Sequence, residues 1–346
     1  MGHRRWKIGL AAIGAAAVVL AAAAGWAYRE LDPARHFDRD DIAILSTGDW
    51  DSSAAPPDPL QDGGEPASDP SDQVLPSEDA GSIQSESSSQ AFQVLLLGVD
   101  SREGRGGRTD VMIVAQVVPS KRKVNLLSIP RDTRVWIPEV GYTKINHAYV
   151  VGQSKSGQEN GGIRESVDAV SRLLRLPIHY YALTDFSGFE TLIDEIGGVT
   201  VEMEEDVYLH HAGGLVLPKG QSHIDGKLAL SLVRERYSFA AGDFARQTQQ
   251  TRVLKTVAKE LLRPSHVPEL AKLLIQSRKW VETNFTDKDL LSLALMFKGL
   301  EDSDIRTAQI PGRSAYTNDP LVGQSLYYWV ADEQKLKALT AGLFGR

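Results

Sequence analysis

Cysteine is absent from this chain of 346 residues, which excludes disulfide bonds, thiolate metal ligands and cysteine nucleophiles. Lysine and arginine are absent from residues 46–90, which carry ten acidic side chains. Residues 91–346 hold 32 basic and 30 acidic side chains, so they have no strong excess of either sign. The net charge of −7 therefore belongs to the acidic stretch. A nearly neutral remainder argues against a nucleic-acid-binding protein.

Charged side chains are also missing from residues 8–28, an apolar run long enough to cross a bilayer as a helix. Arg4, Arg5 and Lys7 precede this run, and positive charge favours the cytoplasmic side. We predict a cytoplasmic tail over residues 1–7 and a single transmembrane helix, with the rest of the chain outside the cell membrane. A cleaved signal peptide is the alternative, but the run is long for a signal core.

Aliphatic residues are scarce in the acidic stretch, which consists mainly of Pro, Ser, Asp, Glu and Gly. Such a composition cannot bury enough apolar surface to become ordered. We predict an extracytoplasmic, acidic, flexible linker over residues 29–91 and a folded domain over residues 92–346.

The folded part alternates strand-like and helix-like segments. FQVLLLGVD, TDVMIVAQVV and KVNLLSIP are nearly continuous apolar runs, as in strands buried on both faces. IRESVDAVSRLL, FSGFETLIDEI and DGKLALSLV have helical periodicity. KLLIQSRKWV and LLSLALMF are further helix candidates, and DIRTAQIP is strand-like. Interleaved elements predict an α/β fold, a three-layer α/β/α domain with a mixed central sheet, preceded by the transmembrane helix and the disordered linker.

Charged residues collect at the predicted strand ends, where ligands of α/β sheets tend to bind. They are Asp100 and Arg102 after the first strand, Arg108 and Asp110 at the start of the second, and Arg131 and Asp132 after the third. Taken singly, each is equally consistent with a solvated loop charge or a local ion pair. The glycine-rich loop EGRGGR lacks the Gly-Lys-Ser/Thr ending of a phosphate-binding P-loop.

The segment FARQTQQTRVLKTVAKELL poses a charge problem. Its predicted helix places Leu254, Val257 and Leu261 on one face, and Gln250 and Arg246 continue that face. An isolated buried cation costs several kcal/mol, so an inward arginine predicts an anionic partner. His147, His210 and His211 show no metal-ligand spacing, which favours surface or core histidines.

Six blocks carry a resemblance to a known family. GVDSR, GRTDVM, SIPRDTRVWIP, KINHAY, DFSGFETLIDEIGGVTV and RERYSFAAGDFARQTQQ resemble, in order, the LytR-CpsA-Psr family of bacterial cell-envelope proteins. The resemblance runs from about Phe92 to Leu262 and continues more weakly to Phe344. One departure is Gln249, which stands where the family often has a second arginine. We expect this change to remove a cation at the rim of the site.

The resemblance implies that residues 92–346 form a catalytic domain. Its activity would be that of a membrane-anchored phosphotransferase that moves a glycopolymer, such as a teichoic acid or capsule, from a polyprenyl-diphosphate carrier onto peptidoglycan. A non-catalytic binder or a diphosphate hydrolase acting on the same carrier is the alternative. The resemblance also implies an apolar tunnel under the sheet, although the same apolar stripes are typical of an ordinary core.

The resemblance further implies roles for individual residues. The diphosphate would be bound by Arg102, Arg108, Arg131, Arg234, Arg236, Arg246 and Gln250. Asp100 and Asp110 would hold Mg²⁺ or Mn²⁺, and Arg131, Asp132 and Asp243 would be catalytic. We interpret one of the aspartates Asp132 and Asp243 as the base that deprotonates the acceptor hydroxyl.

Overall fold

The computed structural model describes residues 37, 44–46, 91–102, 105–155, 160–239, 242–263, 273 and 276–345, with backbone alone for 101–102, 105–106 and 242–245. The predicted cytoplasmic tail and transmembrane helix lie outside these residues. In the part of the chain that the structure describes, no helix is long and apolar enough to cross a membrane.

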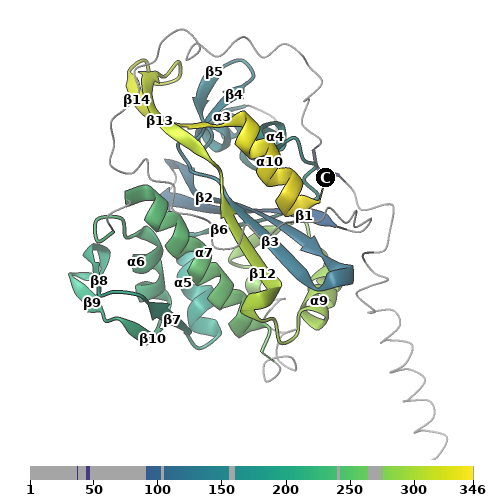
Figure 1. The fold of residues 1–346 in the computed structure, drawn as a ribbon, viewed down its shortest axis with the longest axis vertical. Coiled ribbons are helices and arrows are strands. Elements are labelled where there is room, and N and C mark those ends of the chain that lie inside the picture. Colours follow the sequence, from purple (N-terminus) through teal and green to yellow (C-terminus); the bar gives the residue numbers. More distant parts are fainter. Residues whose placement is uncertain are drawn as a thin grey trace, which may run out of the picture.

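The central sheet is mixed, as predicted (Figure 1). Its strands are, from edge to edge, β11 (Val281–Thr283), β6 (Tyr180–Asp185), β1 (Phe92–Arg102), β2 (Arg105–Val118), β3 (Lys123–Ser128) and β12 (Ile305–Gln309). Strand β1 runs parallel to β6 and antiparallel to β2. Strand β3 runs antiparallel to β2 and parallel to β12. The apolar runs of the sequence form β1, β2 and β3 because these strands are covered on both faces.

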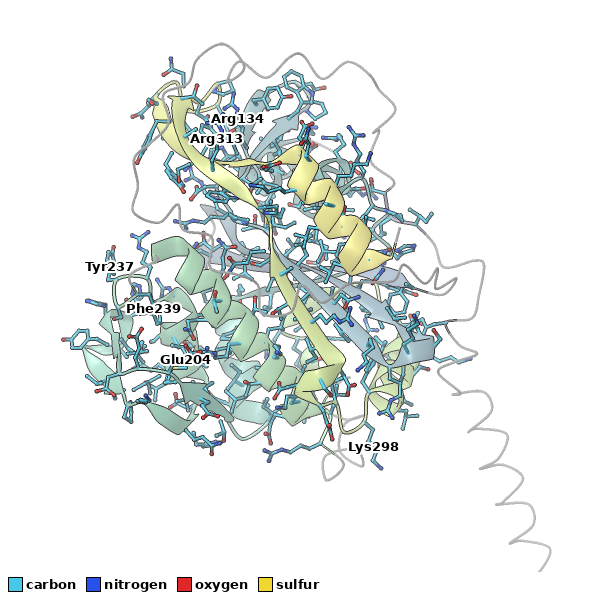
Figure 2. The ribbon with its side chains drawn as sticks, viewed as in Figure 1. Arg134, Glu204, Tyr237, Phe239, Lys298 and Arg313 are labelled. Carbon is cyan, nitrogen blue, oxygen red and sulfur yellow. The ribbon has the colours of Figure 1, made fainter. Side chains whose placement is uncertain are left out.

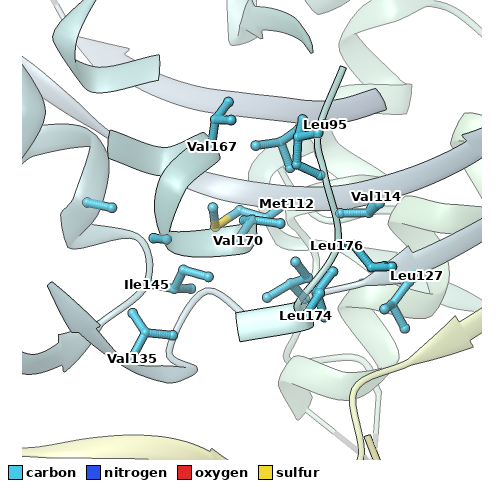
Figure 3. Packing of buried hydrophobic residues seen from close by; sticks show 14 of the residues in the cluster. Leu95, Met112, Val114, Leu127, Val135, Ile145, Val167, Val170, Leu174 and Leu176 are labelled. Atoms are coloured by element: carbon cyan, nitrogen blue, oxygen red, sulfur yellow. The ribbon is translucent and has the colours of Figure 1, made fainter. Parts of the chain in front are cut away.

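Helices lie on both faces of this sheet (Figure 1). One face carries α3 (His147–Ser154), α4 (Gly161–Leu174) and α10 (Glu333–Phe344). The other carries α5 (Phe186–Glu195), α6 (Gly226–Arg234), α7 (Gly242–Leu261) and α9 (Asp287–Met296). Side chains of β1 alternate between the two cores: Leu95 and Leu97 pack with α4, whereas Phe92 and Val94 pack with α9. Figure 3 shows the first of these cores, with Leu95 near Val167 of α4.

Within the described residues, four small two-stranded sheets accompany the central sheet. They are β4 (Arg134–Ile137) with β5 (Gly141–Lys144), β7 (Val199–Met203) with β10 (Gly220–Ile224), β8 (Val207–Leu209) with β9 (Leu215–Leu217), and β13 (Gly312–Asn318) with β14 (Ser325–Ala331). We call the last pair the C-terminal hairpin. It packs beside β4 and β5, far along the chain from them (Figure 1).

Several element ends follow the sequence signals, and two differ. Gly197, with φ +83°, follows α5 in the left-handed conformation that glycine accepts readily. Thr286 caps α9 with a capping box. Asp243 is of a type typical of the residue before a helix, but α7 begins at Gly242 and Asp243 lies in its first turn. The helix predicted for KLLIQSRKWV was wrong at its end, because Val281 instead joins β11, whose backbone pairs with the edge of β6.

Part of the predicted linker packs on the domain. Phe37 is 1% exposed, and its ring stacks on Phe92 with centroids 4.7 Å apart. Ser46 exchanges two backbone hydrogen bonds with Ile178, at 3.3 and 2.9 Å. Phe37 and Ser46, which precede the acidic stretch, therefore pack against the same domain as Phe92.

We expect Phe37→Ala to lower the free energy of unfolding by about 3 kcal/mol, because it removes a fully buried aromatic ring from an apolar core. Urea unfolding of the full chain measures this loss. Ile44→Ala, in the same segment at a side chain that is 52% exposed, is the control and should change nothing measurable. Equal effects of the two substitutions would contradict the docking of Phe37.

Candidate functional site

The candidate site lies at one edge of the central sheet. The parallel strands β1, β3, β6 and β12 all end at this edge, and β2 begins there. Asp100 therefore lies near the end of β1, Asp110 near the start of β2, and Arg131 just after β3. This is the edge at which α/β sheets usually bind ligands.

A β-bulge sets the direction of Asp110. Gly98 pairs with Val111, but the next residue, Val99, pairs with Thr109. Asp110 is therefore the extra residue between two regular pairs. Bulges of this kind bend a strand and redirect a side chain, and they are frequent beside active sites.

Gly107 lets β2 pass close to β1. A Cβ atom at this position would lie 2.4 Å from Cγ1 of Val99 and 2.8 Å from the carbonyl oxygen of Asp100. The next residue, Arg108, pairs in register with Asp100. Gly107 of the EGRGGR loop therefore allows two strands to pack closely. This role agrees with the prediction that the loop is not a P-loop.

Arg131 is at the centre of a chain of charges. Its Nη1 donates to Oδ1 of Asp110 at 2.6 Å, and its Nε lies 3.7 Å from Oδ2 of Asp132. Lys144 of β5 donates to the other oxygen of Asp132 at 2.6 Å. All four side chains are at most one quarter exposed. The sequence reading missed Lys144, although it is the first residue of the quoted block KINHAY.

Helix α7 brings its polar face to the same edge. Arg246 is 5% exposed, in agreement with the inward position expected from periodicity. Its neighbour Gln247 accepts a hydrogen bond from Ser128, the last residue of β3, at 3.1 Å. One turn after Arg246, Gln250 donates to the carbonyl oxygen of Val233 at 3.2 Å. Gln250 thereby links α7 to the end of α6.

The two arginines after Val233 have different surroundings. The guanidinium of Arg234 lies over the ring of Phe186, 4.8 Å from its centroid, beside the end of β6. Arg236 is exposed and donates to the hydroxyl of Tyr237 at 2.7 Å. Figure 2 places Tyr237 near the α6–α7 side of the molecule. Arg234 thus joins the sheet edge, whereas Arg236 is directed along the surface.

Glu235, between these arginines, is the second residue that the sequence reading missed. Its side chain is fully buried and accepts hydrogen bonds from the backbone of His210, Arg236, Tyr237 and Ser238 and from the His210 ring. Burial raises the pKa of this carboxyl, but the hydrogen bonds outweigh burial and hold it below its ordinary value. Glu235 therefore fixes the loop that carries the two arginines.

The two carboxylates predicted to bind a cation lie close together in the sheet. Asp100 and Asp110 lie on neighbouring strands at the bulge, and one oxygen of Asp110 binds Arg131. Oxygen ligands of this type suit Mg²⁺, which takes few protein ligands and keeps positions for substrate oxygens. Within the described residues, no group of three or more His, Asp or Glu side chains could hold a metal ion. The side chains of Arg102 and Asp243 lie outside the described part.

Gln249 is buried, so the predicted position at the rim was wrong, while the loss of a cation relative to the family stays a prediction. The residue is 6% exposed and accepts a hydrogen bond from Arg252 at 3.4 Å. Arg252 also donates to the carbonyl oxygen of Glu202 and pairs with Glu204.

A cleft of about 280 Å³ opens beside the site. Its lining includes Val99 and Asp185 near the ends of β1 and β6, Tyr149 of α3, Trp280 just before β11, and Glu282 of β11. Aromatic rings with nearby carboxylates give the cleft both apolar and hydrogen-bonding surface.

The comparisons define the class of protein. The model of the LytR_cpsA_psr family matches residues 64–344. The polyisoprenyl-teichoic acid–peptidoglycan teichoic acid transferase TagU of Oceanobacillus iheyensis is 32% identical over 255 residues, which cover 74% of this chain and 76% of that protein. TagU of Bacillus cereus is 34% identical and covers 72% and 77%. The chain therefore belongs to the LytR-CpsA-Psr family.

Solved structures agree with this membership. The crystal structure of Bacillus subtilis TagV has a TM-score of 0.62 at 30% identity and covers 73% of this chain and 97% of that chain. A structure of TagT bound to LI-WTA has a TM-score of 0.58 at 28% identity and covers 73% and 91%. The mixed α/β sheet is thus the fold of the family.

We expect Lys144→Met to lower the free energy of unfolding by about 1–2 kcal/mol, since it leaves the partly buried Asp132 without its ammonium partner. Thermal unfolding monitored by circular dichroism measures this change. Lys335→Met is the matched control because its pair with Asp332 is largely exposed, and it should have no measurable effect. If Lys144→Met also leaves the stability unchanged, the ion pair between Lys144 and Asp132 does not stabilise the fold.

Glu235→Gln should cost about 2 kcal/mol at neutral pH, because a buried carboxylate with several donors is replaced by a neutral amide. The folded-state pKa of Glu235 is depressed, so its contribution is present above the ordinary value of 4.5 and is lost as the pH falls through the folded-state pKa. The stability difference from wild type should therefore shrink between about pH 5 and pH 3. Urea titrations across this range test it, with exposed Glu205→Gln as a pH-independent control.

Proposed function

We propose that this protein is a phosphotransferase that moves a glycopolymer from a polyprenyl-diphosphate carrier onto peptidoglycan. The observation that carries the proposal is the partly buried Arg131, held by Asp110 at the sheet edge where Arg234 and Arg246 also lie. The names of the relatives support the reaction class, because TagU and TagV are described as teichoic acid–peptidoglycan transferases.

The charges of the edge suit a diphosphate. Guanidinium groups pair with phosphate oxygens through two parallel hydrogen bonds. Arg131 and Arg246 come from a strand end and from the first turns of a helix, so they approach a ligand from two directions. Arg108 and Arg234 would add charge from β2 and α6. Arg236 would bind further out, next to Tyr237.

Asp100 and Asp110 are the residues that would hold a divalent cation, Mg²⁺ or Mn²⁺. A cation bound there would neutralise part of the charge of the diphosphate. Arg131 holds Asp110 in place through its 2.6 Å hydrogen bond. The neighbouring cleft has room and polarity for sugar units of donor or acceptor.

The reaction follows from this placement. The acceptor hydroxyl oxygen forms a bond to the phosphorus that carries the glycan, and the bond from that phosphorus to the bridging oxygen breaks. Polyprenyl phosphate leaves with the bonding electrons. Such transfers depend mainly on positioning and on stabilising spread negative charge, which is the work of the arginines.

We also propose that residues 8–28 anchor the protein in the cell membrane with the domain outside. The carrier lipid is membrane-bound, so an anchored enzyme would meet it at the bilayer surface. The uncharged run of 21 residues after Arg4, Arg5 and Lys7 supports this topology.

The test is transfer by the full chain from a polyprenyl-diphosphate saccharide to peptidoglycan oligomers with Mg²⁺. Arg131→Ala should reduce transfer by about 10²-fold or more, because it removes a guanidinium that stabilises the negative charge of the transferring phosphoryl group. Asp110→Ala should act in the same direction. Arg122→Ala is the control, since Arg122 precedes β3 at the opposite edge of the sheet and donates to the carbonyl oxygen of Lys298.

The outcomes separate the candidate functions. Donor binding without turnover in the wild type would identify a non-catalytic binder. Release of phosphorylated saccharide that does not depend on the acceptor would identify a hydrolase. Full activity of Arg131→Ala would contradict the site itself.

A further inference from the structure

A buried polar cluster lies directly behind the charged edge. It consists of Thr143 of β5, His147 at the start of α3, Asp319 in the turn of the C-terminal hairpin, and Tyr328 of β14; we call it the His147 cluster. The side chain of His147 is 3% exposed and that of Asp319 is fully buried. Buried polar groups of this kind need complete hydrogen bonding, so their donors and acceptors can be assigned.

Asp319 accepts every hydrogen bond that it makes in this cluster. Its Oδ1 accepts from the backbone N–H groups of Leu321 and Val322, both at 2.8 Å. Its Oδ2 accepts from the hydroxyls of Thr143, at 2.7 Å, and Tyr328. Burial raises the pKa of Asp319, but these hydrogen bonds outweigh burial and hold the pKa below its ordinary value. Asp319 is therefore a carboxylate at neutral pH.

This carboxylate determines the tautomer of His147. The hydroxyl of Thr143 has one proton, which it donates to Asp319. Nδ1 of His147 lies 2.7 Å from the same hydroxyl oxygen, so Nδ1 must be the donor of that contact. The proton of the neutral ring then resides on Nδ1, and the lone pair resides on Nε2.

The elements that carry the His147 cluster are connected to the site by several contacts. Lys144, three residues earlier, binds Asp132, and the N–H of Asn146 donates to the carbonyl oxygen of Arg131 at 3.2 Å. The backbone of Asp132 also accepts from Trp329 of β14. The C-terminal hairpin is thus attached to the loop that carries Arg131.

We propose that His147 is the proton acceptor for the acceptor hydroxyl and that Thr143 and Asp319 are positioning residues which lock it in the Nδ1–H tautomer. This proposal rests on the proposed transferase function. It replaces Asp132 as the base, because the oxygens of Asp132 already face Lys144 and Arg131. In the step, the hydroxyl proton moves to Nε2 while the oxygen bonds to phosphorus and polyprenyl phosphate departs. The resulting imidazolium lies near Asp319, whose Oδ2 is 3.7 Å from Nδ1.

The charge environment is compatible with this role. Burial lowers the pKa of the His147 ring below 6.5; Asp319 opposes this, Arg108 and Lys144 add to it, and Asp132 opposes it weakly. These groups come from the hairpin turn, β2, β5 and the turn after β3. The ring is accordingly neutral at pH 7 and able to accept a proton.

Asp319→Asn gives the sharpest test. The amide oxygen stays with the two backbone N–H groups, so the amide nitrogen donates to Thr143, whose hydroxyl must then donate to Nδ1 of His147. The ring proton should move to Nε2, and nitrogen-15 NMR of the full chain detects the change in tautomer. The turnover number should fall by about 10²- to 10⁴-fold, as when the orienting carboxylate of a histidine base is lost.

His147→Asn keeps a donor at the Nδ1 position and removes Nε2, so kcat should fall by about 10²-fold or more while KM for the polyprenyl-diphosphate saccharide changes little. Tyr327→Phe, on the same hairpin with its hydroxyl near Ser314, is the control and should keep full activity. In wild type, kcat/KM should fall as the pH drops through the lowered pKa of His147. Asp319→Asn, which removes the carboxylate that raises this pKa, should shift the remaining acid limb to lower pH.

The proposal is overturned if wild-type His147 carries its proton on Nε2, or if folded His147→Asn transfers at the wild-type rate. Arg131→Ala, assayed in parallel, separates this failure from failure of the function. Loss of activity in Arg131→Ala with full activity in His147→Asn rejects the base alone. Full activity in both rejects the transferase site.

Discussion

A guanidinium group that is removed from water needs an anion close to it. This requirement governs the arrangement of charged side chains at the edge of the central sheet where the parallel strands end. Arg131 meets it with Asp110 and Asp132, and Lys144 balances the second carboxylate. Arg246 is buried in the first turns of α7. A cluster of cations at the ends of parallel strands is stable as a protein surface only with such partners, and it is well suited to exchange them for the oxygens of a diphosphate.

Local backbone geometry places these charges. The bulge between Gly98 and Val99 turns Asp110 out of the regular pairing of β1 and β2. Gly107 allows the two strands to approach where any side chain would collide with Val99. Glu235 gathers backbone N–H groups of the loop between α6 and α7 and so limits where Arg234 and Arg236 can lie. The positions of the charged side chains at this edge of the sheet are thus set by residues that need not contact a ligand.

Segments from both ends of the chain complete the domain. Phe37 fills a place in the core beside Phe92, and Ser46 pairs with Ile178. The C-terminal hairpin brings Asp319 to Thr143, 176 residues away in sequence, and attaches its strand β14 to Asp132. The proposed base depends on this second closure, because the direction of one hydroxyl proton, on Thr143, decides which nitrogen of His147 is free to act.

Several features of the fold and of the candidate site could be predicted from the sequence alone. Unbroken apolar runs indicated β1, β2 and β3, since strands covered on both faces need them, and helical spacing predicted that Arg246 faces inward. The motif blocks indicated the family, and their positions at strand ends indicated where Asp100, Asp110 and Arg131 would meet. These features are local in the chain, so their periodicity and spacing are visible without coordinates.

Other features depend on contacts between distant segments, which no local pattern encodes. Lys144 meets Asp132, and Asp319 meets Thr143, because β5 and the C-terminal hairpin pack beside the turn after β3. The last residue of KLLIQSRKWV lies in strand β11 because its backbone pairs with that of β6. Gln249 was expected at the rim of the site and is buried, because burial follows from which elements pack together. The residue types and their spacing determined which functional groups the protein has. The tertiary structure determined which charged groups pair with one another, because these pairs join segments that are distant in the chain.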